Sequence, residues 1–176
     1  MNILSIDPGE ATGWSLWVLD DFMPMKRLEY GVITGGVRGF SIWFDFYGRF
    51  EVGEEGVIVF EQFRLGGDVV NPNIEAKAIE GALIYARESQ ETRASLVFNQ
   101  RSDKRQVRDD VLKAAGLWIT GKPVGWTDGR DVNDSQIHAL AYAKSVLRHR
   151  PTLERYFSDS VLEGLERSRR NKSAKT

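Results

Sequence analysis

The stretch MNILSIDPGEATGWSLW, residues 1–17, decides how the rest of the chain is interpreted. Residues 2–6 favour a buried strand, and Asp7 stands at its end, directly before the turn-forming pair Pro8-Gly9. A carboxylate at the edge of a hydrophobic core is costly unless a charged or hydrogen-bonding partner satisfies it. Asp7 therefore predicts either a turn cap or a site to which distant parts of the chain contribute.

The composition bounds the class of protein. The chain has 176 residues, enough for one domain with a substantial core, and it contains no cysteine. Any metal must therefore be held by oxygen atoms or by the two histidines, His138 and His149. We find neither a signal peptide nor an apolar segment of the roughly 18 residues that a membrane span requires. The expectation is a soluble, cytoplasmic protein.

Charge is nearly balanced, with 24 basic and 25 acidic residues, so composition alone does not indicate a nucleic-acid binder. The distribution of charge is more informative. Basic side chains gather in residues 102–113, which include Lys104, Arg105 and Arg108, and again in the last dozen residues. Either segment could face phosphates or form ordinary solvated surface. We expect residues 1–162 to form a single domain and residues 163–176 a basic, flexible tail.

Hydrophobic periodicity gives the order of elements. Strands are predicted at residues 2–7, 12–19, 27–34, 56–62 and 95–98, and helices at 40–50, 74–88, 102–115 and 131–148. The first three strands follow one another through short links, which indicates an antiparallel meander. A right-handed crossover would then place the fourth strand parallel to the first, so that Asp7 and Glu61 lie at the same end of the sheet. The expected fold class is α/β, with a five-stranded mixed sheet flanked by helices.

An aromatic stripe marks the helix predicted at residues 40–50. Its members recur at three- and four-residue spacing: Phe40, Trp43, Phe44, Tyr47 and Phe50. Such a stripe could stack on bases, but at helical spacing it more commonly forms core. We predict that it packs in the core.

Acidic residues also stand on the core face of the last predicted helix. Asp131, Asp134 and His138 are spaced i, i+3 and i+7, which places them on one helical face. Asp131 could simply cap the helix, whereas Asp134 on a face meant for burial needs another explanation. His138 is interpreted as a satisfied core histidine or as a group that orients a ligand or a water molecule.

Together these acids predict a metal site. Clustered carboxylates repel one another unless cations compensate, and hard oxygen ligands suit Mg²⁺ or Mn²⁺. Two such ions about 4 Å apart would support phosphodiester hydrolysis. The competing interpretation of Glu61 is a salt bridge to Arg64 or Lys77.

Three segments carry a family likeness: IDPGEATGW from Ile6, VIVFEQF from Val57 and DVNDSQIHALAYA from Asp131. In order and spacing they resemble the RuvC-like Holliday-junction resolvases, especially the compact versions encoded by bacteriophages. The likeness covers most of residues 1–148. The DPGxxxTG motif alone also resembles phosphate-binding loops of the actin and sugar-kinase superfamily, but the three motifs together are more specific.

The resemblance implies a ribonuclease H-like fold and a homodimer that presents two active sites to a four-way DNA junction. It implies Mg²⁺-dependent nicking of paired strands in a bacterial cell or phage-infected host, with two ions per site and Mn²⁺ able to substitute. The implied catalytic and metal-binding acids are Asp7, Glu61, Asp131 and Asp134. Phage members often carry histidine at the position of Asp131, and Asp128 is the alternative ligand there.

The resemblance also implies DNA contacts. The family places an aromatic residue shortly after the glutamate, where it wedges into the junction centre, and Phe63 beside Arg64 is the nearest candidate. Lys104, Arg105 and Arg108 would hold the DNA backbone.

Other functions fit parts of the same pattern. A non-catalytic DNA-binding or scaffold protein would keep the fold without turnover, and a nuclease for flaps or other branched DNA would keep the chemistry with a different substrate. A nucleotide-using relative of actin and the sugar kinases needs two copies of this fold around its cleft, whereas 176 residues hold one.

Overall fold

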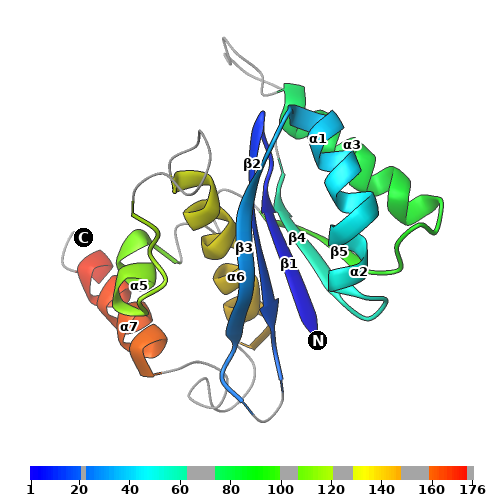
Figure 1. Ribbon diagram of the computed structural model, residues 1–176. Coiled ribbons are helices and arrows are strands. Elements are labelled where there is room, and N and C mark those ends of the chain that lie inside the picture. Colours follow the sequence, from blue (N-terminus) through cyan, green and yellow to red (C-terminus); the bar gives the residue numbers. More distant parts are fainter. Residues whose placement is uncertain (21–22, 63–73, 100–106, 121–128, 148–158, 174–176) are drawn as a thin grey trace.

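The predicted α/β fold is confirmed by the computed structural model, which describes residues 1–20, 23–62, 74–99, 107–120, 129–147 and 159–173 (Figure 1). The sheet has five strands in the order β3-β2-β1-β4-β5. The strands are β1 (Asn2–Asp7), β2 (Ala11–Val18), β3 (Lys26–Thr34), β4 (Val57–Glu61) and β5 (Ser95–Asn99). As expected, β1, β2 and β3 form an antiparallel meander, while β4 is parallel to both β1 and β5.

Helices cover both faces of the sheet, which makes three layers (Figure 1). One face carries α1 (Gly36–Trp43), the π-helical turn η1 (Phe44–Gly48), α2 (Arg49–Val52) and α3 (Ile74–Glu88). The other face carries α6 (Arg130–Leu147), with α5 (Asp109–Ala114) and α7 (Asp159–Ser173) farther from the sheet. Within the described ranges, no helix combines the length and the hydropathy needed to cross a bilayer.

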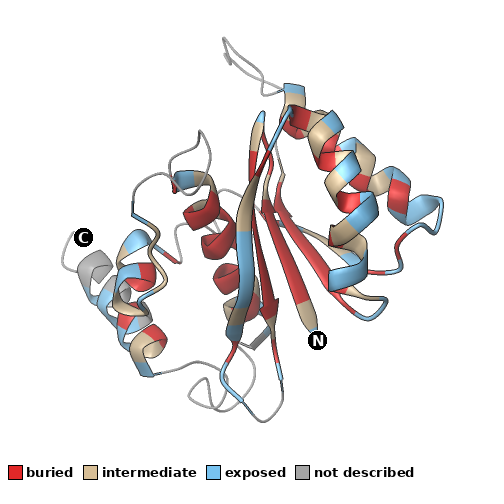
Figure 2. Ribbon diagram, in the orientation of Figure 1, coloured by how far each residue is buried: buried red, intermediate tan, exposed pale blue. Residues whose placement is uncertain are grey.

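Side chains along β1 point alternately to the two faces of the sheet, and this determines which helical layer each one packs against. Leu4 and Ile6 join the buried cluster that contains Phe40 and Leu83 from the α1 and α3 side. Ile3 joins the opposite cluster, which includes residues of α6. Because successive strand residues point to opposite faces, Asp7 lies on the same face as Ile3, toward α6. Figure 2 shows that α6 is buried along most of its length.

The aromatic stripe is core in part. Phe40 and Phe44 are buried, and Trp43 and Tyr47 pack against the same cluster. Phe50, however, is 66% exposed, so the prediction that it belongs to the core was wrong. The reason is the π-helical turn at Phe44–Gly48, which has more residues per turn than an α-helix and so moves the residues after it off the face that α-helical spacing predicts.

The segment assigned to a flexible tail contains much of α7, which runs from Asp159 to Ser173. Its first turns hold it in place, since Val161 is buried and a Cβ on Gly164 would lie 2.9 Å from Val111 Cα of α5. The rest of the helix is polar, so the sequence pattern gives little sign of these contacts, and the flexibility of residues 163–176 stays a prediction. The helix expected from residue 102 begins at Asp109 in the described part of the chain.

Candidate metal centre

Asp7 and Glu61 end two neighbouring parallel strands. Ile6 of β1 is paired with Phe60 of β4, so the acid that follows each of them emerges at the same edge of the sheet. The Glu61 side chain is 4% exposed and that of Asp7 is 15% exposed. The convergence expected from the strand order therefore exists.

The turn after Asp7 is closed by a different residue. The Thr12 hydroxyl accepts a hydrogen bond from Gly9 N at 3.2 Å and donates one to Gly9 O at 2.9 Å. This small closed turn carries the chain from β1 to β2 and leaves the Asp7 carboxylate directed to the α6 side of the sheet.

His138 of α6 completes the cluster. Its Nε2 lies 3.4 Å from Glu61 Oε2 and 3.7 Å from Asp7 Oδ1, and its side chain is fully buried. One ligating atom from each of Asp7, Glu61 and His138 lies within 4.8 Å of the other two. The sequence pointed to His138 only as a core or orienting residue, whereas the structure places it between the two acids.

This spacing fits a bound cation. Two ligands about 2.1 Å from one ion are about 3.0 Å apart at a right angle and about 3.4 Å apart at a tetrahedral angle. The ligating oxygens of Asp7 and Glu61 lie within 4.8 Å of each other, so a modest approach of the two carboxylates would let both reach one ion. Two carboxylates in a nearly enclosed position also need positive charge nearby, which a divalent cation would supply.

Asn99 indicates how His138 contributes. Asn99 ends β5, pairs with Glu61 in the sheet, and donates from Nδ2 to the His138 carbonyl oxygen at 3.0 Å. The same Nδ2 lies 3.4 Å from His138 Nδ1. Since an amide NH₂ group only donates, a neutral His138 with this neighbour carries its proton on Nε2, facing the two carboxylates. Asp7 and Glu61 are thus the better ligands, and His138 is suited to hold them in place.

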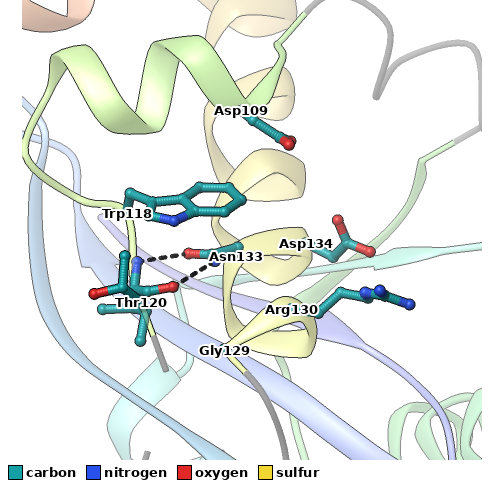
Figure 3. Close-up of a pocket in the computed structure, with 8 residues that line it drawn as sticks. Asp109, Trp118, Thr120, Gly129, Arg130, Asn133 and Asp134 are labelled. Atoms are coloured by element: carbon teal, nitrogen blue, oxygen red, sulfur yellow. Dashed lines mark hydrogen bonds between the residues drawn. The ribbon is translucent and has the colours of Figure 1, made fainter. Parts of the chain in front are cut away.

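The other two predicted acids lie near the start of α6. The backbone of Asp131 packs directly against Gly13, the residue paired with Asp7 across β1 and β2. The approach is so close that a Cβ on Gly13 would lie 2.0 Å from the Asp131 carbonyl oxygen. Asp134 lies one helical turn before His138 and lines an adjacent pocket (Figure 3). The structure does not bring Asp131 or Asp134 into the set of mutually close ligating atoms formed by the other three described residues.

Several solved structures have a similar fold, among them two structures of Thermus thermophilus RuvC and one of a yeast mitochondrial resolvase. Thermus thermophilus RuvC in complex with a Holliday junction substrate has a TM-score of 0.60 at 14% identity, covering 85% of this chain and 97% of that one. A second Thermus thermophilus RuvC structure has a TM-score of 0.61 at 14% identity, covering 84% and 97%. The yeast mitochondrial Holliday junction resolvase Ydc2 has a TM-score of 0.55 at 13% identity, covering 99% and 86%. The chain has the RuvC fold. No family model matches it, and no curated protein matches it in sequence.

Buried hydroxyl groups hold α6 on the RuvC-like sheet. Ser5 Oγ donates to the Ser135 carbonyl oxygen at 2.7 Å, and Ser135 Oγ lies 3.1 Å from Ser15 Oγ. All three serines are fully buried. Small side chains let the helix approach β1 and β2 closely, and their hydrogen bonds fix its position along the strands. This arrangement determines where His138 meets Asp7 and Glu61.

Side-chain hydrogen bonds hold α6 against the segment that follows α5. Asn133 accepts from Ile119 N and donates to Ile119 O, both at 3.0 Å. Arg27 of β3 donates to Gln136 Oε1 at 2.5 Å and to Leu117 O at 3.2 Å. Burial lowers the pKa of the Arg27 guanidinium, which reflects its partial withdrawal from water. These contacts fix α6 along the flank where it meets β3 and the segment after α5.

Of the predicted DNA-contacting residues, Arg108 lies within the described ranges. Arg108 is exposed at the start of α5, where it precedes the first helical residue. The remaining predicted residues lie outside the described ranges: Phe63, Arg64, Lys104, Arg105, Asp128 and His149. Lys77, the other cation considered for Glu61, forms a salt bridge with Glu80 at 2.7 Å.

Sequence reasoning did not select Asn99, Gly13 or the three serines. The sequence did hold a sign of the buried serines, because Ser5 and Ser15 each stand between two apolar residues in a strand, at positions that face a core. Buried hydroxyl groups need partners, which indicates a closely packed helix on that face. No local pattern could show that Asn99 meets His138, since 38 residues lie between them and their contact depends on the assembled sheet.

Proposed function

We propose that the protein is a divalent-metal-dependent endonuclease that acts on branched DNA, with the four-way junction as its substrate. The observation that carries the proposal is the meeting of Asp7, Glu61 and His138 at the ends of two parallel strands. The fold supports it, because the similar structures include a RuvC bound to a Holliday junction, a second RuvC structure and a Holliday junction resolvase.

In this proposal Asp7 and Glu61 hold Mg²⁺, or Mn²⁺ in its place, and the acids of α6, Asp131 and Asp134, complete a site for two ions. Bound divalent cations neutralise the developing negative charge of phosphodiester hydrolysis and lower the pKa of the attacking water. The protein side chains supply fixed oxygen ligands in a largely enclosed position, so that little reorganisation is needed when the phosphate arrives.

His138 has a positioning role. Its Nε2 proton is directed to the Asp7 and Glu61 carboxylates, while Asn99 fixes the ring from behind through Nδ1. Groups that orient metal ligands through hydrogen bonds commonly alter metal affinity by about 10- to 100-fold when they are removed. His138 therefore supports the site without contacting the substrate.

DNA contacts and assembly complete the proposal. Arg108, together with Lys104 and Arg105, would neutralise backbone phosphates, and Phe63 beside Arg64 would enter the junction centre. A homodimer would present two such sites to the two strands that must be cut in one junction.

A cleavage assay tests the proposal. A labelled four-way junction, a flap, an RNA–DNA hybrid and a linear duplex are each incubated with the protein in Mg²⁺ or Mn²⁺, with Asp7→Asn as the matched control. Paired nicks in the junction, absent from the duplex and from the Asp7→Asn reaction, support a resolvase. Cuts in flaps or in RNA hybrids would assign another substrate, and binding without cuts in either metal would instead indicate a scaffold.

A further inference from the structure

A pocket of about 550 Å³ opens beside the candidate metal centre, between the start of α5 and the start of α6 (Figure 3). This volume lies within the range of roughly 300–1,000 Å³ that is usual for small-ligand sites. Figure 3 shows the indole ring of Trp118 projecting between Asp109 on one side and Asn133 and Asp134 on the other.

Trp118 forms a preformed aromatic wall. The Lys113 ammonium group lies over one face of the ring, 4.5 Å from its centroid, while the ring itself lines the pocket and is partly buried against the core on the α6 side. The next residue, Ile119, is held at both backbone polar atoms by the Asn133 amide. A Cβ on Gly129 would lie 2.7 Å from the Ile119 carbonyl oxygen, so the floor of the pocket is closely packed. The ring is therefore held in position before any ligand arrives.

The remaining walls are polar and carry both kinds of hydrogen-bonding group. Arg130 supplies donors, Asp109 supplies acceptors, and the Thr120 hydroxyl can do either. An aromatic face bordered by mixed donors and acceptors suits a flat heterocycle with polar edges. Nucleobases have that chemistry, and stacking on a tryptophan is a common way for proteins to hold them.

The pocket also adjoins the proposed reaction centre. Asp134 precedes His138 by four residues on α6, which is about 6 Å along the helix axis. A phosphate bound to a cation that Asp7 and Glu61 would hold would therefore leave a nearby base of the same strand within reach of the pocket. Near a branch point, such a base is easier to unstack than one inside a continuous duplex.

We propose that this pocket binds one unpaired nucleobase next to the phosphate that is cut, with Trp118 stacking on the base. The inference rests on the proposed function and goes further, because it places selection of the cleavage position in a specific pocket. Trp118 supplies stacking, which every base can provide, while Asp109, Thr120 and Arg130 border the edge of the base and set which base is preferred.

The test combines a protein change with a DNA change. Trp118→Leu removes the aromatic ring and keeps apolar volume, while an abasic analogue removes one base at a time on either side of the cut. For the wild-type protein, we expect one abasic position to lower kcat/KM by about 10-fold. For Trp118→Leu, the intact junction should show a similar loss, and the same abasic position should then have no further effect.

Controls separate stacking from folding. Trp118→Phe keeps an aromatic face and should retain most of the wild-type response, and Phe46→Leu makes a matched change at a side chain 82% exposed on the opposite layer. Equal sensitivity of wild type and Trp118→Leu to every abasic position would overturn the pocket proposal while leaving the nuclease intact. If the wild-type protein does not cut the intact junction in Mg²⁺ or Mn²⁺, the proposed function itself fails, whether or not the protein binds the junction.

Discussion

Replacing Gly13 by alanine should displace α6 from the sheet and disrupt the metal centre. The new Cβ would lie 2.0 Å from the Asp131 carbonyl oxygen and 2.7 Å from Val132 N, both of which are backbone atoms that cannot rotate away. The helix must retreat by about 1 Å before the first contact reaches the 3.0 Å below which real Cβ contacts essentially do not occur.

This displacement of α6 lowers the free energy of unfolding by an amount that can be estimated. The hydrogen bond between Ser135 Oγ and Ser15 Oγ, now 3.1 Å long, would stretch to about 4 Å and be lost. Overpacking typically costs about 1–3 kcal/mol, and a lost buried hydrogen bond adds about 1 kcal/mol. We therefore expect the free energy of unfolding to fall by about 2–4 kcal/mol, which corresponds to a decrease in Tm of about 5–15 °C for a chain of this size.

The assay is thermal unfolding followed by circular dichroism, together with a calorimetric Mn²⁺ titration of the folded protein. Gly81→Ala in α3 is the matched control, because a Cβ there meets nothing within 4 Å. Replacing a helical glycine by alanine should raise stability by about 0.5–1 kcal/mol. A Gly13→Ala protein with wild-type Tm and wild-type Mn²⁺ affinity would refute the proposed packing of α6 against β2.

Other expected outcomes concern the metal centre itself. Asp7→Asn should lower junction cleavage by at least about 100-fold, because it removes a charged ligand, while junction binding in Ca²⁺ stays intact; full activity in gel-resolved cleavage would remove the nuclease proposal. His138→Ala should weaken Mn²⁺ binding by about 10-fold or more, whereas His138→Gln, which keeps an N–H donor, should lose less Mn²⁺ affinity. Calorimetry that finds the weaker binding in His138→Gln would exclude the positioning role. Mn²⁺ at about 100 times its Kd should stabilise the wild-type protein by about 2.7 kcal/mol, which EDTA reverses; an equal shift in Glu61→Gln would mean that the ion binds elsewhere.

The meeting of Asp7 with Glu61 could be predicted because it follows from strand order. Parallel neighbours end at the same edge of a sheet, and each strand has an acid as its last residue. The position of α6 could not be predicted in the same way. A helical face is broad, and which of Asp134 and His138 reaches the strand ends depends on where the helix crosses the sheet. That crossing is fixed by contacts between residues far apart in sequence, such as Ser5 with Ser135.

The aromatic helix shows a second limit of sequence reasoning. Its first buried residues, Phe40 and Phe44, obey α-helical spacing, but the π-helical turn changes the rotation per residue before Phe50 is reached. No residue type in that segment distinguishes a π-helical turn from an α-helical one, so periodicity alone predicts a continuous α-helix. The prediction was therefore correct at the start of the helix and wrong at its end.

The central claim is that Asp7 and Glu61 share a divalent cation at the ends of β1 and β4. An anomalous difference map from a crystal grown or soaked in Mn²⁺ tests it directly. The claim predicts a peak within about 2.0–2.6 Å of a carboxylate oxygen of each acid, and loss of that peak in Asp7→Asn. Mn²⁺ found only at other acidic groups, with none between these two strand ends, would contradict it.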